Sequence, residues 1–253
     1  MTAPVSLFVS WQNPATRQWF VVGKLSDTAD GYTFGYTWGA DLAQEAGFSP
    51  LDAFPDLDGV YESETLFPTF SSRLPPESRP DYEDFVSWLH LPAGEATPLL
   101  LLDRHSGAKQ TDNYELFRAP EPDGDGNLYA TFFLRGLRHR DTRIQESAEA
   151  MSRGTRLYLA PDDQNGRDPQ AVLLRTEQDI FVPGYLPRYL AGPARMLLRL
   201  NRDAVTVTVE KVNPAPAPIQ LRLLCRFSAT DVPRGLPLFT EQQYRRRVIE
   251  GAA

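Results

Sequence analysis

Residues 157–190, LYLAPDDQNGRDPQAVLLRTEQDIFVPGYLPRYL, decide the fold of the C-terminal half of the chain. Apolar side chains alternate with others at 157–159 and again at 171–174, the period of a half-buried β-strand. Pro161 opens a polar turn between the two runs, and Pro183-Gly184 marks a second turn. The stretch therefore predicts two short strands joined by a polar loop.

The loop between these strands concentrates residues with functional chemistry. We expect Asn165-Gly166 to supply a positive φ, and Asp163, Asn165 and Asp168 to hydrogen-bond the loop's own backbone. Such a loop can hold a carboxylate rigidly at the rim of a small β-barrel, directed at a ligand.

The flanking sequence continues the β-rich pattern. We expect strands at 128–134, 204–210 and 219–227, of which the last closes the barrel, and helices at 144–152 and 189–198. The segment 204–210 has the clearest strand pattern in the chain, because valine and threonine alternate through it.

The N-terminal half has a different organisation. Strands are expected at 5–11, 19–25 and 32–36, and helices at 41–47, 82–89 and 96–104. Between the third strand and the second helix the chain is irregular and rich in proline. We expect its large apolar side chains to fill the core: Leu51, Phe54, Tyr61, Leu66, Phe67 and Phe70.

These patterns predict a mostly β, α+β protein of two domains. An N-terminal β-rich domain with short helices spans 1–118, and the acidic, proline- and glycine-rich segment 119–127 is a linker. A small OB-like β-barrel spans 128–235. A helical tail then covers 236–253, with Thr240 and Gln243 as a capping box.

Composition restricts the class of protein. The chain has 253 residues, 42% apolar and 23% charged, as in ordinary globular proteins. The net charge of −7 is uneven: residues 1–125 hold 7 basic against 20 acidic side chains, and residues 126–253 hold 19 against 13. The basic half is rich in arginine, which suits bidentate phosphate contacts and base stacking. The alternative is that the two halves simply dock or are solvated.

A single cysteine and the lack of membrane or secretion patterns predict a cytoplasmic protein. No apolar run approaches the roughly 20 residues that cross a bilayer, and the N-terminus lacks a basic segment followed by an apolar one, so we expect no membrane association. The single cysteine, Cys225, lies among strand-like apolar residues and is expected to be a buried hydrophobe.

Catalytic signatures are missing from the sequence. Its three histidines are scattered, and one cysteine cannot build a zinc cluster. There is no Gly-x-Ser-x-Gly turn and no glycine-rich phosphate loop, and the acidic pairs lie in predicted loops without a nearby base. We therefore expect a non-catalytic protein with no cofactor and no metal.

The order of motifs in the C-terminal half resembles the HIRAN domain. The motifs are Gly136-Leu137-Arg138 after a strand, Leu157-x-Leu159, Asn165-x-x-Asp168 followed by Ala171-Val172, and the run GYLPRYLA at 184–191. The resemblance covers about residues 128–230. It implies a small OB-like β-barrel that binds the 3′ end of single-stranded DNA.

The resemblance implies roles for the first basic motif. Arg138 matches an arginine that contacts phosphate, and His139 stands where family members carry an aromatic ring that stacks on the terminal base. Arg167 departs from the family pattern, because an aromatic residue supports the stacked base at that position. A guanidinium can stack too, but the loss of the ring puts selectivity for 3′ ends in question.

The remaining positions belong to the loop and the segment after it. Asn165 and Asp168 match the acidic loop, whose aspartate accepts a hydrogen bond from the 3′-hydroxyl; a 3′-phosphate would be repelled there. Tyr185 and Arg188 match positions that contact the DNA backbone. The alternative is that Asp168 only stabilises its own turn and Tyr185 belongs to the barrel core.

The N-terminal half is similar to the small N-terminal subdomain of HipA-type kinases. The similarity covers about residues 5–117 and rests on a hairpin, an aromatic third strand, Ser49-Pro50-Leu51, LFPTF at 66–70 and RLPP at 73–76. The kinase catalytic part is missing. The similarity thus implies a fold and a protein-binding role, without catalytic residues.

The sequence therefore predicts a protein that recognises single-stranded DNA or DNA ends through its C-terminal barrel and a protein partner through its N-terminal domain. The rival hypothesis is a regulatory interaction module, of a toxin–antitoxin or phage-defence type, that does not bind DNA.

Overall fold

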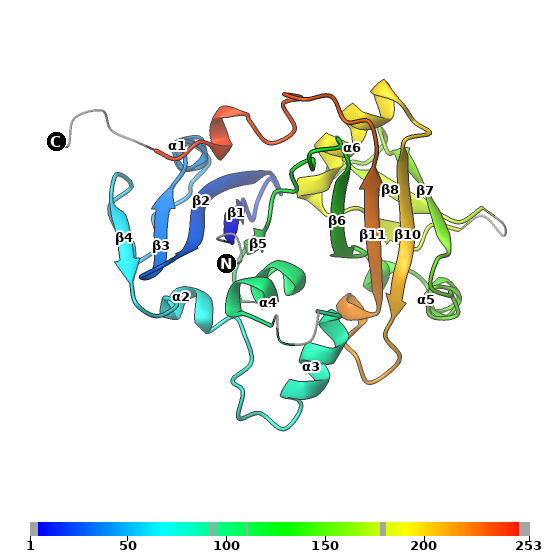
Figure 1. The fold of residues 1–253 in the computed structure, drawn as a ribbon, viewed down its shortest axis with the longest axis horizontal. Helices are drawn as coiled ribbons and strands as arrows, with labels where there is room; N and C mark the ends of the chain where they lie inside the picture. The colour runs from blue at the N-terminus through cyan, green and yellow to red at the C-terminus, as the bar shows by residue number, and fades with distance from the viewer. Residues whose placement is uncertain (1–4, 92–93, 95, 110, 178–180, 248–253) are drawn as a thin grey trace. The chain divides into compact units, whose positions relative to one another are not determined.

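The computed structural model describes residues 5–91, 94, 96–109, 111–177 and 181–247. The chain forms two compact units (Figure 1). Unit 1 consists of the described residues within 1–86, 91–119 and 239–253, and unit 2 of those within 87–90 and 120–238.

Unit 1 is built on a five-stranded antiparallel sheet of order β4-β3-β2-β1-β5. The strands are β1 Ser6–Gln12, β2 Trp19–Thr28, β3 Gly31–Tyr36, β4 Val60–Ser63 and β5 Tyr114–Phe117. The first three confirm the predicted hairpin and aromatic third strand. The two edge strands were not predicted, because each has only four residues and lacks a clear alternation of period two.

Four helices accompany this sheet in the chain: α1 Gly39–Glu45, α2 Pro68–Ser71, α3 Tyr82–Leu89 and α4 Pro98–His105. Thr97 accepts a hydrogen bond from the backbone N–H of Leu100, so α4 begins with a threonine cap followed by proline. Residues 82–86 of α3 belong to unit 1 and residues 87–89 to unit 2.

The core of unit 1 is aromatic. The Phe34 and Phe54 rings lie 4.4 Å apart between centroids, and Phe70 packs 5.4 Å from Phe34. The predicted core residues of the irregular segment are confirmed: Phe54, Phe67 and Phe70 are buried, and Leu51, Tyr61 and Leu66 pack against them partly buried. Ring packing of this kind adds about 0.5–1.5 kcal/mol per pair beyond the area buried.

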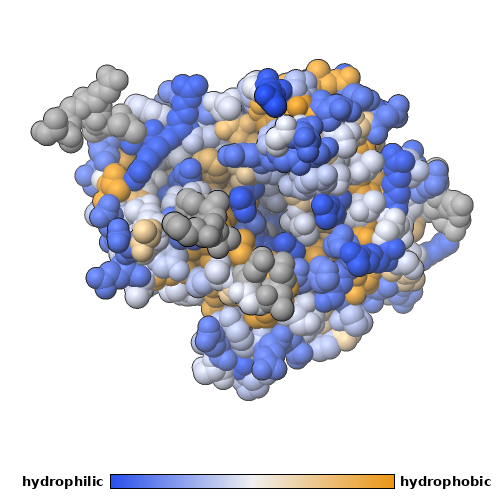
Figure 2. Space-filling view, in the orientation of Figure 1, coloured by the Kyte–Doolittle hydropathy of each residue, from blue (hydrophilic) through white to orange (hydrophobic). Residues whose placement is uncertain are grey.

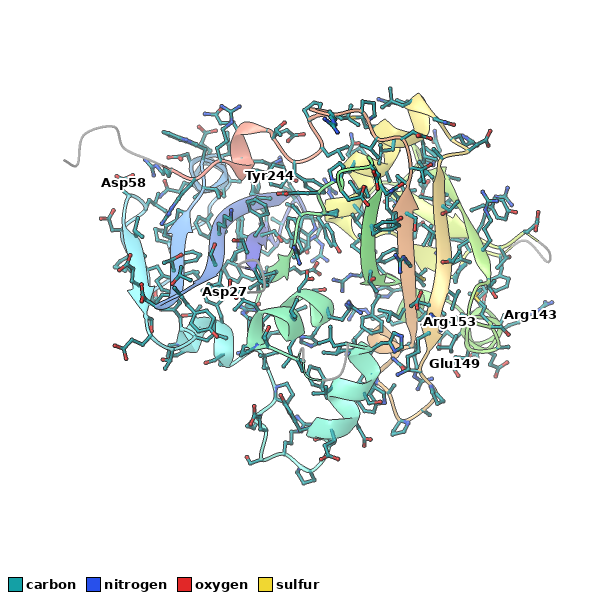
Figure 3. All side chains as sticks on the ribbon, in the orientation of Figure 1. Asp27, Asp58, Arg143, Glu149, Arg153 and Tyr244 are labelled. Atoms are coloured by element: carbon teal, nitrogen blue, oxygen red, sulfur yellow. The ribbon has the colours of Figure 1, made fainter. Side chains whose placement is uncertain are left out.

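The predicted C-terminal helix is wrong. In the described part of the tail, residues 236–247, the helical element is the short 3-10 turn η3, Gln242–Tyr244 (Figures 1 and 3). Arg246 then pairs with Thr37 in a β-bridge. The backbone groups of Arg245 and Arg247 bond Trp38 and Tyr36 at 3.0 Å, which requires an extended chain. Tertiary hydrogen bonds thus override the local capping signal.

Side chains fix the tail to unit 1 as well. Tyr244 packs edge-on against Phe8, with 5.2 Å between ring centroids, and Arg247 reaches Asp41 and Asp58 at 3.2 Å each. The guanidinium of Arg247 also lies 5.5 Å from the Trp38 ring. The tail is therefore a structural part of unit 1.

Unit 2 is a half-barrel sheet of order β6-β11-β10-β7-β8-β9, antiparallel throughout. Its strands are β6 Leu128–Phe133, β7 Arg156–Pro161, β8 Val172–Arg175, β9 Gly184–Tyr185, β10 Val205–Val212 and β11 Leu223–Ala229. Strand β11 lies between β6 and β10, so it does not close the barrel as predicted. The two edges meet instead where Arg135, just after β6, exchanges backbone hydrogen bonds with Tyr185.

Glycine is required at this closure. A Cβ atom on Gly184 would lie 2.1 Å from the carbonyl oxygen of Arg135, so a side chain has no room there. The Pro183-Gly184 turn predicted from the sequence thus places β9 against the end of β6.

Alternation along the strands separates a core face from an outer face. Leu157, Leu159, Val207 and Phe227 point inward and are buried. The buried Cys225 also belongs to this core face, which confirms its prediction as a buried hydrophobe. Tyr158, Thr208 and Arg226 occupy intervening positions and keep contact with solvent.

The helical segments of unit 2 are η1 Leu137–His139, α5 Thr142–Glu149, α6 Arg188–Leu200 and η2 Ile219–Leu221. Asp141 caps α5 by accepting from Ile144 N–H at 2.9 Å. Asn213 and Lys211, at the end of β10, donate to the carbonyls of Trp88 and Ser87 at 2.9 and 2.7 Å. These bonds satisfy carbonyl groups at the end of α3.

The residues predicted as a linker include an ordered turn. The carboxylate of Asp123 accepts from the backbone N–H groups of Asp125 and Asn127 at 3.0 and 2.8 Å. These hydrogen bonds favour the ionised carboxylate and lower the pKa of Asp123.

Among the described residues, no helix is both long and apolar enough to pass through a lipid bilayer. Figure 2 shows hydrophilic side chains over much of the visible face, with smaller apolar areas between them.

Candidate nucleic-acid interface at the β7–β8 loop

The loop between β7 and β8 is shaped by its own side chains. Asn165 Oδ1 accepts from the backbone N–H groups of Arg167 and Asp168, both at 3.0 Å, and Asp168 Oδ1 accepts from Gln170 N–H at 2.8 Å. Neither Asn165 nor Gly166 has a positive φ, so that prediction is wrong. The asparagine side chain turns the chain without a left-handed residue.

Helix α6 binds the loop through two ion pairs. Arg188, the first residue of α6, forms an ion pair with Asp168, and Arg195 forms one with Asp163. The two arginines are seven residues apart, which places them on one face of the helix. Arg195 also donates to the carbonyl of Ala171 at 3.4 Å. Asp163 therefore bonds the helix, where we had predicted a bond to the loop backbone.

A second connection links the loop to β9. The Tyr185 hydroxyl donates to Asp162 Oδ2 at 3.0 Å, and Asn165 Nδ2 donates to the same oxygen at 3.0 Å. Tyr185 is half-buried and directed at the loop, so it does not belong to the barrel core. Asp162 thus fixes the phenol and the amide of two predicted site residues.

The basic motif lies on the turn η1. Gly136 precedes it with φ +86°, a left-handed conformation that favours glycine. Arg138 and His139 are both exposed, and Arg138 Nε donates to His139 Nε2 at 3.0 Å. Arg140 follows, with its guanidinium carbon 5.3 Å from the Tyr185 ring centroid.

A chain of contacts in the structure therefore links the seven predicted residues. Asn165, Arg167 and Asp168 share the loop, and Asp168 and Asp162 tie it to Arg188 and Tyr185. Arg138 and His139 are linked to the other five indirectly. Their chain neighbours Arg135 and Arg140 contact Tyr185, the first through a β-bridge and the second through its guanidinium over the ring.

Three residues of this group were missed from the sequence. They are Asp162, Arg140 and Arg195, to which the sequence patterns assign no role. An arginine seven residues after Arg188 was the available signal for Arg195, because that spacing repeats the same helical face. Asp162 and Arg140 had no comparable signal, since their partners come from other strands.

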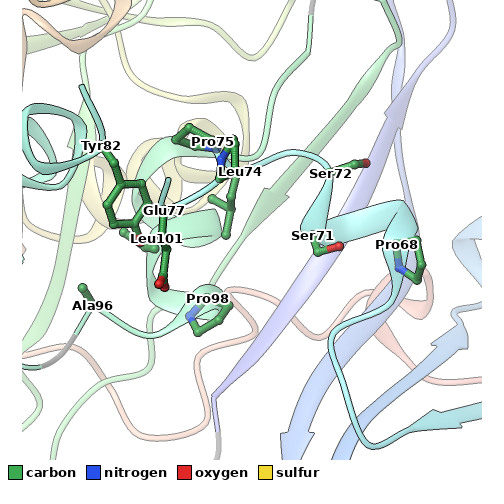
Figure 4. Close-up of a pocket in the computed structure, with 11 residues that line it drawn as sticks. Pro68, Ser71, Ser72, Leu74, Pro75, Glu77, Tyr82, Ala96, Pro98 and Leu101 are labelled. Atoms are coloured by element: carbon green, nitrogen blue, oxygen red, sulfur yellow. The ribbon is translucent and has the colours of Figure 1, made fainter. Parts of the chain in front are cut away.

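The pocket shown in Figure 4 lies elsewhere, in unit 1. Its volume is about 490 Å³, and four prolines line it together with Glu77, Tyr82 and Leu101. None of the seven predicted residues contributes to it. Among the residues that the structure describes, no three histidine, cysteine or acidic side chains are grouped as a metal site.

Comparison with known protein families finds a match in the same part of the chain. A family model of the HIRAN domain matches residues 108–230. None of the curated proteins compared matches the chain.

Two solved structures are similar to part of the chain. A protein from Lactobacillus plantarum is 19% identical, with a TM-score of 0.31, over 41% of this chain and 99% of its own. The HIRAN domain of human HLTF is 18% identical, with a TM-score of 0.28, over 42% of this chain and 77% of its own.

The comparisons do not support the resemblance of residues 5–117 to the N-terminal subdomain of HipA-type kinases. The HIRAN model begins at residue 108, before β5, and ends just beyond β11. Residues 108–230 therefore contain a HIRAN domain.

Proposed function

We propose that this protein binds single-stranded DNA without catalysing a reaction, and that the β7–β8 loop recognises the 3′ end. The observation that carries the proposal is the fixed position of Asp168. Its Oδ1 holds Gln170 N–H and Arg188, and no hydrogen bond to Oδ2 occurs within the described part of the chain. This second oxygen is an acceptor that a 3′-hydroxyl can use.

Basic side chains support the same ligand. Arg138 is exposed on η1, and Arg188 is only partly occupied by Asp168, with 30% of its side chain exposed. Both can contact phosphates, as the HIRAN resemblance implies. His139 and the exposed Arg167 offer flat groups beside the loop on which a terminal base can stack.

The test compares 3′-hydroxyl and 3′-phosphate single strands by fluorescence anisotropy. We expect the wild-type protein to prefer the hydroxyl on the order of tenfold, because a unit charge a few ångströms from another costs about 1–4 kcal/mol near a protein surface. Asp168→Asn keeps the shape and removes the charge, so this preference should disappear.

Asp163→Asn is the matched control, since it makes the same charge change in the same loop at a side chain that is 69% exposed. It should keep the preference for the hydroxyl. Equal binding of the two ends by the wild type would refute end recognition. An equal loss of the preference in both variants would show that the total charge of the loop, and not Asp168 itself, causes it.

A protein-binding role for unit 1 stays a prediction. Its exposed large apolar side chains among the described residues are Leu42 and Val60. Two such side chains do not make up the contiguous apolar patch of several hundred Å² that marks many protein interfaces.

A further inference from the structure

The outer face of the half-barrel carries a second group of basic and aromatic side chains. It consists of Tyr129, Arg156, Tyr158, Arg175 and Arg226, here called the outer Arg–Tyr face. It is separate from the seven residues at the β7–β8 loop. The strand register explains why these side chains point the same way.

One row crosses four strands. Arg156 on β7 pairs with Thr208 on β10, Thr208 pairs with Arg226 on β11, and Arg226 pairs with Thr131 on β6. Directly paired residues project from the same face of an antiparallel sheet. Because neighbouring strands are about 4.8 Å apart, Arg156 and Arg226 stand about 10 Å apart across Thr208.

Arginines lie over tyrosine rings at both ends of the row. The guanidinium carbons of Arg156 and Arg175 are 5.1 and 5.2 Å from the Tyr158 ring centroid. Arg226 lies 4.7 Å from the ring centroid of Tyr129, which is 46% exposed. Arg156 and Arg226 are also exposed, and Thr131, Thr206 and Thr208 are half-buried beside them.

Within the part of the chain that the structure describes, few acidic groups lie near this face. Glu177 hydrogen-bonds Tyr158, and Glu210 at the far end of β10 is held by Arg153 at 2.7 Å. The face thus gathers three arginines in a chain whose net charge is −7. Such a positive face is complementary to phosphate, while its rings and guanidinium planes offer stacking surfaces for bases.

We propose that the outer Arg–Tyr face is a second binding surface for single-stranded DNA, which holds the strand away from its 3′ end. The inference deepens the proposed function, because it assigns the same ligand class to another surface. Strands β7 and β8 carry Tyr158 and Arg175 in one stem, and the loop at the tip of this stem carries Asp168. A strand bound at the tip can therefore continue along the stem.

The first test uses circular single-stranded DNA, which has no 3′ end to recognise. The wild-type protein should bind it, and the triple variant R156Q/R175Q/R226Q should bind it at least tenfold more weakly. Each lost phosphate contact should lower the slope of log K against log salt by about 0.7, or about 2 for all three. R199Q/R202Q/R234Q is the matched control, because these exposed arginines lie outside the strands of unit 2.

A second test uses the length of linear DNA. The wild type should bind strands of about 16 nucleotides more tightly than strands of about 4, the range of site sizes for OB folds. The triple variant should lose this length dependence. Tyr129→Leu should weaken binding of the long strand about tenfold, whereas Tyr129→Phe should preserve it, because only the leucine variant loses the ring.

The outcomes separate this inference from the proposed function. Circular DNA bound by the wild type but lost in the triple variant supports the outer face, even if 3′-hydroxyl and 3′-phosphate ends bind equally. Failure of the wild type to bind circular DNA, or equal losses in the triple variant and its control, would overturn the inference. In that case a measured preference for the 3′-hydroxyl would still support the proposed function. Capture of a protein through this face, without DNA binding, would also overturn it.

Discussion

Tyr185 and Asp162 are joined by a hydrogen bond of 3.0 Å between the phenol and a carboxylate oxygen. The bond connects the short strand β9 to the first residue after β7. Since Asn165 donates to the same oxygen, one carboxylate positions both the loop and the ring that supports it.

We predict that Tyr185 and Asp162 are energetically coupled. A double-mutant cycle of Tyr185→Phe and Asp162→Asn, followed by urea unfolding of the full chain, should give a coupling free energy of about 1 kcal/mol. The reason is that either substitution alone breaks the charge-assisted hydrogen bond. Additive effects of the two substitutions would show that the bond does not stabilise the fold.

Arg138→Ala should weaken binding of single-stranded DNA by on the order of 1–3 kcal/mol, the usual cost of a lost charged hydrogen bond. Arg143→Ala is the control, because Arg143 is also exposed but lies on α5 (Figure 3). Anisotropy titrations at moderate salt measure both variants. Unchanged affinity in Arg138→Ala would remove Arg138 from the interface.

Asp103 provides a prediction on pH. Burial raises the pKa of its carboxyl above the ordinary value of 3.8, although the hydrogen bond from Arg118 N–H, at 2.8 Å, opposes the shift. The ionised form is therefore disfavoured in the folded state, and its cost to stability grows as the pH rises from below 3.8 through the folded pKa.

Asp103→Asn should remove this cost and keep an oxygen that accepts from Arg118. Its free energy of unfolding should exceed that of the wild type at pH 7, and the difference should shrink toward pH 3. Thermal or urea unfolding at several pH values measures the difference. A gain of equal size at both pH values would exclude titration of Asp103 as the cause.

Cys225 should be unreactive in the folded protein. Its side chain is fully buried in the sheet core, and burial raises the pKa of the thiol, so thiolate is scarce. Labelling with a thiol reagent should be slow in buffer and fast in denaturant. Rapid labelling without denaturant would mean that β11 opens readily.

Much of the fold was predictable because its strands have local signals. Residues 205–210 alternate valine with other residues, and the structure forms β10, Val205–Val212, there. The edge strands β4 and β5 depend on pairing with distant strands and have no such pattern. At the C-terminal tail a local signal was misleading instead. Thr240 and Gln243 fit a helix cap, but the tail forms hydrogen bonds with residues such as Tyr36, about 200 residues earlier in the chain.

In the candidate site, too, local contacts were predictable and contacts between distant residues were not. Asn165 and Asp168 share a loop, so their proximity followed from the sequence. The ion pair of Asp168 with Arg188 did not, because it needs the position of α6 relative to the loop. Asp162 was missed for the same reason, since its role comes from Tyr185, 23 residues later.

The return of residues 239–247 to unit 1 has a consequence for the order in which the protein is made. Unit 1 takes its described residues from sequence on both sides of the segment 120–238, so the ribosome finishes this segment first. Unit 1 lacks Tyr244 and Arg247 until every strand of the half-barrel has been synthesised, so the contacts of Tyr244 with Phe8 and of Arg247 with Asp41 form late. The domain that starts first is completed last.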